Sequence, residues 1–144
     1  MNTGKKIKLI RTMRSLTQKE LAEKVGTHEV MIRKYEIGKA VPKDEQLKKI
    51  AMALEVNVNS LREFEVNDDN DVLPMLFAID EAFPITFKEI DGVPGIFFEN
   101  DSLNHFLSDW QAMKELMEMG RQNEDNYQLW KTIRPGVTKI YSED

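Results

Sequence analysis

Apolar residues recur at intervals of three and four along residues 1–66, the spacing of helices that bury one face. The pattern predicts five short helices in this part of the chain. The apolar positions of the first helix are Ile7, Leu9, Ile10, Met13 and Leu16. Those of the second are Leu21, Ala22 and Val25, and those of the fourth are Leu47, Ile50, Ala51 and Leu54.

Capping residues and glycines mark the second and third helices. Thr17-Gln-Lys-Glu20 is a capping box, in which the hydroxyl and the carboxylate each bond a backbone N–H, and it opens the second helix. Gly26 closes that helix. A third helix is predicted from His28 to about Glu36, and Gly38 ends it. Only a tight turn therefore separates the second helix from the third.

The fourth and fifth helices have similar boundary residues. Pro42 and Asp44 open the fourth helix, because proline and an acidic residue are both favoured at a helix start. Asn57 can cap a short fifth helix that contains Leu61 and Phe64. The first part of the chain is therefore expected to be a five-helix domain.

A break in the apolar pattern divides the chain. Residues 65–71 read Glu-Val-Asn-Asp-Asp-Asn-Asp and contain a single apolar residue. Such a segment cannot bury a core and is typical of a linker. A calcium loop would need a glycine and a distant glutamate that this run lacks. We therefore predict a domain over residues 1–66, an acidic linker over residues 67–72 and a second domain over residues 73–144.

The chain beyond the linker mixes two kinds of periodicity. An apolar helix is predicted from Leu73 to about Phe83, and Pro84 stops it. The segments Ile85–Ile90 and Ile96–Glu99 are typical of strands, and the Asp-Gly turn between them indicates a β-hairpin.

Two helices are predicted to follow the hairpin. Ser102 caps a long helix with one apolar face, which consists of Leu103, Phe106, Leu107, Trp110, Met113 and Met117. A last helix is predicted from about Asp125 to Ile133, and we expect Trp110 and Trp130 in the core. The expected fold is mostly α: a five-helix domain followed by a small α+β domain of one helix, a β-hairpin and two helices.

Charge is distributed unevenly between the two halves. Residues 1–66 carry 14 Lys and Arg against 9 Asp and Glu, a net charge of +5, whereas residues 67–144 carry 6 against 16, a net charge of −10. Within residues 1–43 the count is 11 against 4, a net charge of +7. Such asymmetry indicates that the first half meets a polyanion and that the second does not.

Composition excludes several classes of function. The sequence has no cysteine and two distant histidines, His28 and His105, so no thiolate site or histidine-rich metal site is expected. No phosphate-binding loop, zinc-protease motif or nucleophile elbow occurs, so we expect no enzymatic activity, no catalytic residue, no metal and no cofactor. No apolar run approaches the roughly 20 residues of a membrane span. The N-terminus lacks a signal-peptide core, so we expect a cytoplasmic protein.

The segment from Arg11 to Pro42 has a specific chemical meaning. Two helices joined by a tight turn at a glycine form a helix-turn-helix, which places its second helix in the DNA major groove. The segment contains, in order, Thr17-Gln18, Glu20-Leu21-Ala22, Gly26, Ile32, Tyr35-Glu36, Gly38 and Pro42. This order resembles the phage-repressor/Cro type of helix-turn-helix transcription factor over roughly residues 4–64. The resemblance implies a domain that binds operator DNA as a dimer and reads bases with its third helix.

The resemblance also implies roles for individual residues. Gln18 corresponds to a glutamine that holds a backbone phosphate and braces the third helix, and Arg11 and Glu36 correspond to a structural pair that ties the first helix to the third. The residues assigned to the DNA interface are Gln18, His28, Glu29, Val30, Arg33, Lys34, Lys39 and Lys43. Arg33 projects from the face of Glu29, so we assign it a base contact, with guanine preferred. The three lysines fit phosphate contacts.

Three positions depart from the family pattern. Glu29 stands where glutamine is common: it can accept a hydrogen bond from cytosine N4 but repels phosphate, so it either filters out wrong sequences or points elsewhere. His28 replaces a small polar residue and is either a pH-dependent phosphate contact or a weak helix cap. Ser15 stands where glycine or asparagine often turns, so slight backbone strain is expected there.

The acidic half has no specific motif but carries a large apolar load, which includes Met75, Leu76, Phe77, Ile79, Phe83, Phe97, Phe98, Phe106 and Trp110. Apolar surface left exposed would suit self-association, so we predict a dimerisation or effector-control domain. For the whole chain we predict a dimeric repressor that reads an inverted repeat, with double-stranded DNA and a second copy as partners. A protein or small-molecule effector is a further candidate partner of the second domain. The alternative is an antitoxin or adaptor whose acidic half grips a protein partner.

Overall fold

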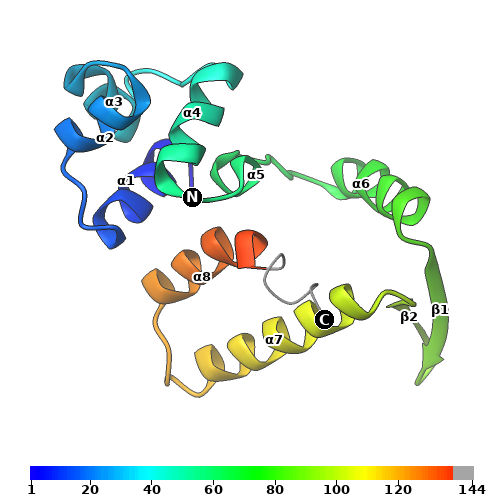
Figure 1. The fold of residues 1–144 in the computed structure, drawn as a ribbon. Coiled ribbons are helices and arrows are strands. Elements are labelled where there is room, and N and C mark those ends of the chain that lie inside the picture. The colour runs from blue at the N-terminus through cyan, green and yellow to red at the C-terminus, as the bar shows by residue number, and fades with distance from the viewer. Residues whose placement is uncertain (138–144) are drawn as a thin grey trace. The chain divides into compact units, whose positions relative to one another are not determined.

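The computed structural model describes residues 1–137, which form eight α-helices and one β-hairpin (Figure 1). The chain divides into two compact units. The first comprises Met1–Glu63 together with the chain from Asn123 onward, and the second is Phe64–Gln122. The mostly helical fold with a small hairpin is the predicted one.

The described residues of the first unit form six helices. They are α1 (Thr3–Met13), α2 (Gln18–Val25), α3 (Glu29–Glu36), α4 (Asp44–Leu54), α5 (Val58–Leu61) and α8 (Glu124–Val137). The five predicted N-terminal helices are confirmed. The prediction that Phe64 belongs to the fifth helix is wrong, because the backbone becomes extended at Arg62 and leaves Phe64 exposed.

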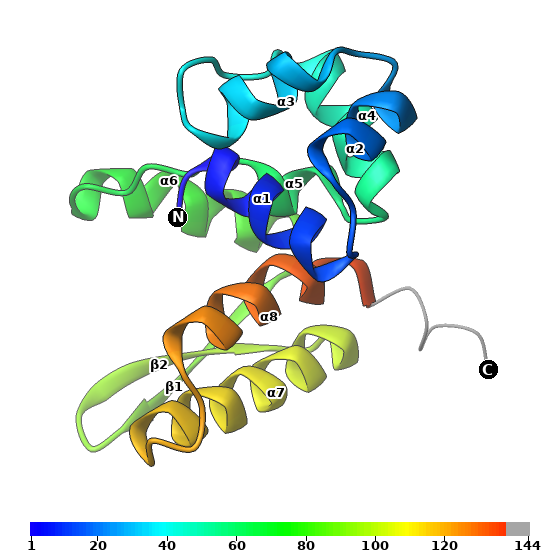
Figure 2. The same ribbon diagram turned by 90° about the vertical axis from the view of Figure 1, so that its left-hand side faces the viewer.

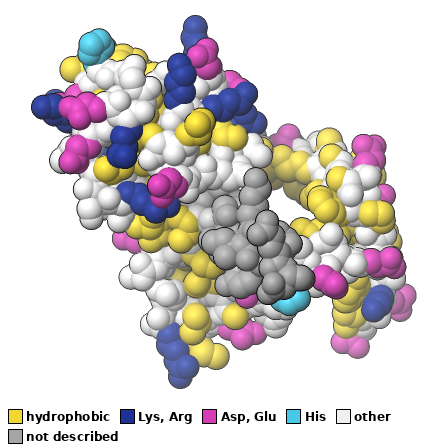
Figure 3. Space-filling model, viewed as in Figure 1, with side chains coloured by type: hydrophobic (Ala, Val, Ile, Leu, Met, Phe, Trp, Pro, Cys, Tyr) yellow, Lys and Arg dark blue, Asp and Glu magenta, His cyan; other side chains and the backbone are white. Residues whose placement is uncertain are grey.

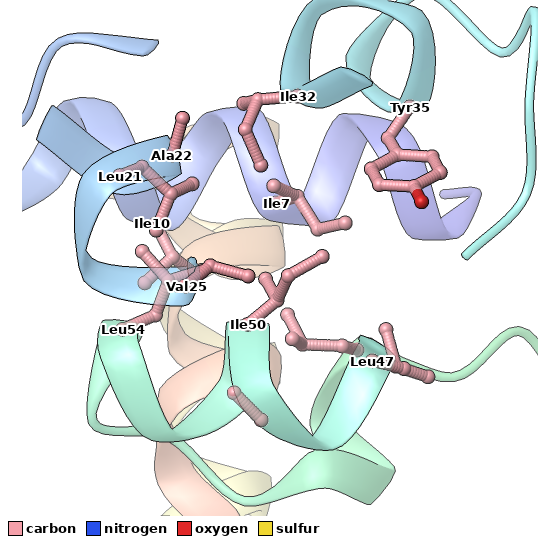
Figure 4. Close-up of a cluster of buried hydrophobic side chains, with 12 residues drawn as sticks. Ile7, Ile10, Leu21, Ala22, Val25, Ile32, Tyr35, Leu47, Ile50 and Leu54 are labelled. Carbon is pink, nitrogen blue, oxygen red and sulfur yellow. The ribbon is translucent and has the colours of Figure 1, made fainter. Parts of the chain in front are cut away.

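The core of the first unit is built by the apolar faces of α1 to α5. Figure 4 shows Ile7 from α1, Val25 from α2 and Ile50 from α4 pointing toward one another. The buried apolar residues are Ile7, Ile10, Leu21, Ala22, Val25, Ile32, Tyr35, Leu47, Ile50, Ala51, Leu54 and Leu61. Each fully buried side chain of this kind contributes about 1.5–3 kcal/mol relative to an exposed one, so this core is what fixes the relative positions of α2 and α3.

Two backbone positions adjust the packing of this core. Gly4 lies where α1 crosses the end of α3, and a Cβ placed there would lie 2.1 Å from the carbonyl oxygen of Tyr35. Only glycine lets the two backbones approach so closely. The strain expected at Ser15 is confirmed: its φ is +55°, in the left-handed region that disfavours residues with a Cβ.

The helix α8 completes the first unit. Leu129 and Ile133 pack against the core, and α1 and α5 are the neighbours of α8 (Figure 2). Burial of the Lys6 ammonium lowers its pKa below the ordinary value of 10.5; Glu63 opposes this shift, and Lys131 of α8 adds to it. The predicted second domain, residues 73–144, includes this helix, so the structure divides the chain differently. An amphipathic pattern shows that one face is buried but not which element covers it.

The second unit contains α6 (Asp69–Ala82), β1 (Ile85–Ile90), β2 (Val93–Phe98) and α7 (Asp101–Glu118). The strands are antiparallel, and Phe87 pairs with Ile96. Asp91 and Gly92 both have positive φ, +51° and +79°, as a tight two-residue hairpin turn requires. The hairpin is confirmed, but β2 begins earlier than predicted because so short a turn leaves Pro94 in the ladder, opposite Glu89.

The helix α6 also begins earlier than predicted, within the expected linker over residues 67–72. The Asp68 side chain caps it by accepting a hydrogen bond from the Asn70 N–H, and Asp71 accepts one from the Asn67 N–H. Negative charge near a helix N-terminus is favourable, so the acidic run starts a helix instead of remaining irregular.

The second unit has no core of its own among the described residues, since none between Phe64 and Gln122 is buried. The prediction that Trp110 lies in the core is wrong: it is 37% exposed, and its ring lies 5.8 Å from that of Phe106. Trp130, in α8, is half-buried. The generous apolar load of this unit is therefore left facing outward.

Candidate nucleic-acid interface

The turn between α2 and α3 is built by local interactions. The Glu20 N–H donates to the Thr17 hydroxyl (3.1 Å), and the Thr17 N–H donates to the Glu20 carboxylate (2.7 Å), which completes the predicted capping box. These donors, the backbone N–H first, lower the pKa of Glu20 below its ordinary value of 4.5. At the other end Gly26 has a φ of +75° and its N–H caps α2. The chain can therefore start α3 after two residues and the cap residue His28.

The helix α3 has a buried side and an exposed side. Its buried residues are Ile32, Tyr35 and Glu36. Its exposed residues are Glu29, Val30, Arg33 and Lys34. Because residues four apart are neighbours on a helix surface, Glu29 lies beside Arg33, and Val30, which is 61% exposed, lies beside Lys34. The structure thus brings four of the predicted interface residues onto one outward face.

A buried ion pair holds α3 against α1. The Arg11 Nε donates to Glu36 Oε1 (2.5 Å), its Nη2 donates to Glu36 Oε2 (3.1 Å), and its Nη1 donates to the Leu16 carbonyl (2.6 Å). The Glu36 side chain is 1% exposed and that of Arg11 is 12% exposed. Arg11 and Glu36, expected as a structural pair, therefore do tie the two helices together.

Gln18, the first residue of α2, joins this pair. Its Nε2 donates to Glu36 Oε2 (2.7 Å), which links the start of α2 to the end of α3. The side chain is half-buried. The bracing of the third helix that the resemblance implied for Gln18 is thus present, and the same amide has a second N–H that can serve a phosphate.

The remaining predicted contacts surround α3. His28 occupies the N-cap position of α3 but makes no side-chain cap hydrogen bond, and it is exposed. Lys39 follows the left-handed turn at Gly38, and its N–H donates to the Lys34 carbonyl (2.9 Å), so its backbone lies against the end of α3. Lys43 is exposed at the N-cap of α4, again without a side-chain cap bond.

The cations of this face are not neutralised within the described part of the chain. Arg33, Lys34, Lys39 and Lys43 form no ion pair there, whereas Lys48 of α4 is paired with Asp44. Figure 3 shows Lys and Arg side chains over the first unit. Unpaired guanidinium and ammonium groups around an exposed helix are suited to phosphate and to base edges.

Val41 is an exposed apolar residue near the candidate interface that the sequence does not indicate. It is 80% exposed in the loop between Lys39 and Lys43, beside two of the predicted phosphate contacts. A single valine in a loop carries no sequence pattern, so only the structure shows that this apolar side chain is exposed there.

The geometry defines a helix-turn-helix domain with an exposed second helix. The comparison with protein families agrees, because residues 7–61 match the family model described as helix-turn-helix. The predicted resemblance to regulators of this type is thus confirmed for this part of the chain. No described helix is both long enough and apolar enough to span a membrane.

The chain is also similar to named proteins. Multiprotein-bridging factor 1 from Debaryomyces hansenii is 43% identical over 58 residues, which are 40% of this chain and 39% of that protein. The chain therefore spans about two fifths of the length of this relative. Among solved structures, the P22 c2 repressor in complex with a synthetic operator is 25% identical and has a TM-score of 0.43, over 45% of this chain and 98% of that chain. Bacillus thuringiensis PlcR, in complex with the peptide PapR7 and DNA, is 19% identical with a TM-score of 0.42, over 99% of this chain and 45% of that chain.

Proposed function

We propose that this DNA-binding helix-turn-helix regulator is a sequence-specific, dimeric repressor that reads an inverted repeat with α3. The observation that carries the proposal is the outward face of α3, where Arg33 and Lys34 stand beside Glu29 and Val30 and form no ion pair within the described residues. A face of this kind at the second helix of a helix-turn-helix fits the major groove.

Each residue of the interface has a distinct task in this proposal. Arg33 donates two hydrogen bonds to guanine, and Val30 offers an apolar contact to a thymine methyl group. Lys34, Lys39 and Lys43 bind phosphates, which position the domain without reading sequence. The Arg11–Glu36–Gln18 network fixes the position of α3 relative to α2, so that these contacts with DNA can form at the same time.

Glu29 places a negative charge in the interface. A carboxylate can only accept hydrogen bonds, so it suits cytosine and is repelled by phosphate. Because Glu29 and Arg33 are four residues apart on one face, the pair favours a site in which a cytosine lies near a guanine. Wrong sequences leave the carboxylate without a donor, and this raises specificity at some cost in affinity.

A dimer is proposed because one recognition helix reads few base pairs. Two helices reach two half-sites when these are about 34 Å apart, one turn of the duplex. The second unit, with 13 acidic against 3 basic residues over Phe64–Gln122, is repelled by DNA and stays off the duplex.

The test combines selection of bound fragments from random DNA with three substitutions. Arg33→Ala should cost about 1–3 kcal/mol on the selected site, roughly 5- to 150-fold in affinity, with little change on unrelated DNA. Lys34→Ala should weaken binding to all sequences alike and reduce the salt slope by about one. Lys48→Ala is the matched control, because it removes a cation that lies on α4 and is already paired with Asp44.

Two results would contradict the proposal. One is an absence of binding to any double-stranded DNA at low ionic strength. The other is an equal loss on selected and unrelated DNA when Arg33 is replaced, which would reduce this residue to a phosphate contact.

A second candidate is an adaptor that bridges DNA and another protein, or an antitoxin with a protein partner. Its support is the 43% identity of the N-terminal part to multiprotein-bridging factor 1, together with the exposed apolar residues of the second unit. An adaptor would purify with a different protein at fixed stoichiometry. A repressor on its own would bind its operator at full affinity without one.

A further inference from the structure

The central part of helix α6 is apolar on every side. No charged residue occurs from Val72 to Ile79, and none of the helix is buried in the described structure. Leu73 is 48% exposed and Phe77 is 65% exposed. A helix segment with apolar residues around its whole circumference is normally covered on all sides, and the described residues of the second unit do not cover this one.

The hairpin adds a second apolar face that continues from α6. The Ile85 N–H donates to the Asp80 carboxylate (2.8 Å), which ties the start of β1 to the last turn of α6. On one face of the hairpin Phe87 pairs with Ile96, and these side chains are 69% and 41% exposed. An isolated two-stranded hairpin is marginally stable in water. The helix α7 packs against β2 but leaves Phe87 and Ile96 exposed, so this face of the hairpin needs a further partner.

The exposed area is large enough for a stable protein interface. Nine large apolar side chains of α6 and the hairpin are between 37% and 69% exposed. At about 150–200 Å² for a side chain of this size, their exposed surface is roughly 700–900 Å². A standard interface buries about 800 Å² on each partner. Figure 3 shows such hydrophobic side chains at the surface over α6 and the hairpin.

A small molecule would not cover this surface. A hollow of about 440 Å³ lies along α7 and is lined by Leu107, Trp110 and Lys114, among others. Neither Phe77 nor Phe87 lines it. A ligand held there would leave the apolar surface of α6 and the hairpin in water, so the occupant must be a macromolecule.

We propose that α6 and the β1–β2 hairpin are covered by the same elements of a second copy of the chain, so that two chains share one core. The proposal rests on the dimer of the proposed function and names the surface that forms it. The acidic residues flank the apolar stretch of α6: Asp68, Asp69 and Asp71 precede it, and Asp80 and Glu81 follow it. Two copies can therefore bury the stretch between them with the carboxylates at the rim, in water.

An apolar surface of this size also requires a partner that is bound at all times and in a fixed ratio. A monomer that kept this surface exposed to water would aggregate. A second copy is always present where the first is made, and folding and pairing can then be one event. The open edge of β1, which has no proline, offers backbone groups to the pairing, whereas β2 carries Pro94.

Salt separates a second copy from a basic protein partner. The second unit has a net charge of −10, from 13 acidic and 3 basic residues over Phe64–Gln122. Two such units repel each other, so added salt should strengthen their association as the carboxylates are screened. A basic partner would instead be released by salt.

The experiment is sedimentation of the full chain over a range of concentration and salt, without DNA. Wild type should be a dimer that tightens from about 0.05 M to 0.5 M salt. Phe77→Asp and Phe87→Asp should each raise the dimer Kd at least about ten-fold, since a charge would enter a buried centre. Met52→Asp is the matched control on α4: Met52 is 79% exposed, and its replacement should leave the Kd unchanged.

A second measurement keeps the proposal testable if an aspartate variant does not fold. The chain has no cysteine, so Ser102→Cys offers a single labelling site at the exposed start of α7. Chains labelled separately with donor and acceptor dyes should show energy transfer after mixing, and excess unlabelled chain should abolish it. Absence of transfer at concentrations where the chain is soluble overturns the proposal.

The remaining outcomes are equally decisive. A wild-type monomer at all concentrations means that the first unit of the same chain or another protein covers the surface, and it overturns the proposal. A dimer broken by Met52→Asp but not by Phe77→Asp places the interface on the first unit and also overturns it. A dimer that binds no DNA refutes the proposed function alone. A chain that is monomeric in solution but binds an inverted repeat as two copies refutes only this inference.

Discussion

Replacement of Arg11 by methionine tests whether the buried ion pair holds α1 to α3. Methionine keeps the length and apolar contacts of the side chain but removes its charge and its donors. Glu36 receives two of its three hydrogen bonds from Arg11 and one from Gln18. Arg11→Met therefore leaves a carboxylate whose side chain is 1% exposed with a single amide donor.

The expected cost follows from this burial. Removal of one partner of a buried pair typically costs about 3–5 kcal/mol, because the other charge is left without compensation. The lower end, about 3 kcal/mol, applies here because the Arg11 side chain is at the edge of the protein, 12% exposed, and water can enter the space it leaves. A loss of this size is a large part of the stability of a small domain.

Urea unfolding followed by circular dichroism measures the effect. Arg14→Met is the matched control, since Arg14 pairs with Glu55 at the surface, where the two side chains are 39% and 75% exposed. That variant should lose less than about 0.5 kcal/mol. Arg11→Met combined with Glu36→Leu should recover much of the loss, because no buried charge remains. Equal stability of the Arg11 and Arg14 variants would refute the argument.

Two further substitutions test the packing of the first unit. In most helices, replacing glycine by alanine stabilises by about 1 kcal/mol. In Gly4→Ala, however, the new Cβ would lie 2.1 Å from the Tyr35 carbonyl oxygen, so thermal unfolding should show a lower Tm than wild type. A higher Tm would contradict this close approach. Leu129→Ala should destabilise the first unit by roughly 1–2 kcal/mol, less than a fully buried leucine would, and should speed hydrogen exchange in α1 and α5, whereas Met119→Ala, at a side chain 63% exposed, should change neither.

The features that could be predicted from sequence are those fixed by neighbouring residues. The capping box at Thr17, the left-handed turn at Gly26 and the Asp91-Gly92 hairpin turn each depend on a few adjacent side chains and backbone angles. The outward face of α3 follows from helical periodicity alone. For this reason most of the candidate interface could be predicted from the order of residues along the chain.

The features that could not be predicted depend on distant contacts. Nothing near Gly4 in the sequence indicates that the Tyr35 carbonyl lies against it. The apolar positions of α8 are equally compatible with either unit, and only the packing of Leu129 on the N-terminal core decides between them. The exposure of Phe77 could not be predicted either, because an apolar helix is typical of a core whether one chain or two complete it.

The position of α8 in the sequence determines when the first unit can be completed during translation. A ribosome that has released residues 1–63 has produced five of the helices of the first unit, but the helix that closes it is translated only after the whole of Phe64–Gln122. The elements α6 and the hairpin thus leave the ribosome before the first unit is complete. In the proposed dimer, two nascent chains can pair through these elements before α8 is made. Chains that end prematurely would lack the helix that packs on α1 and α5.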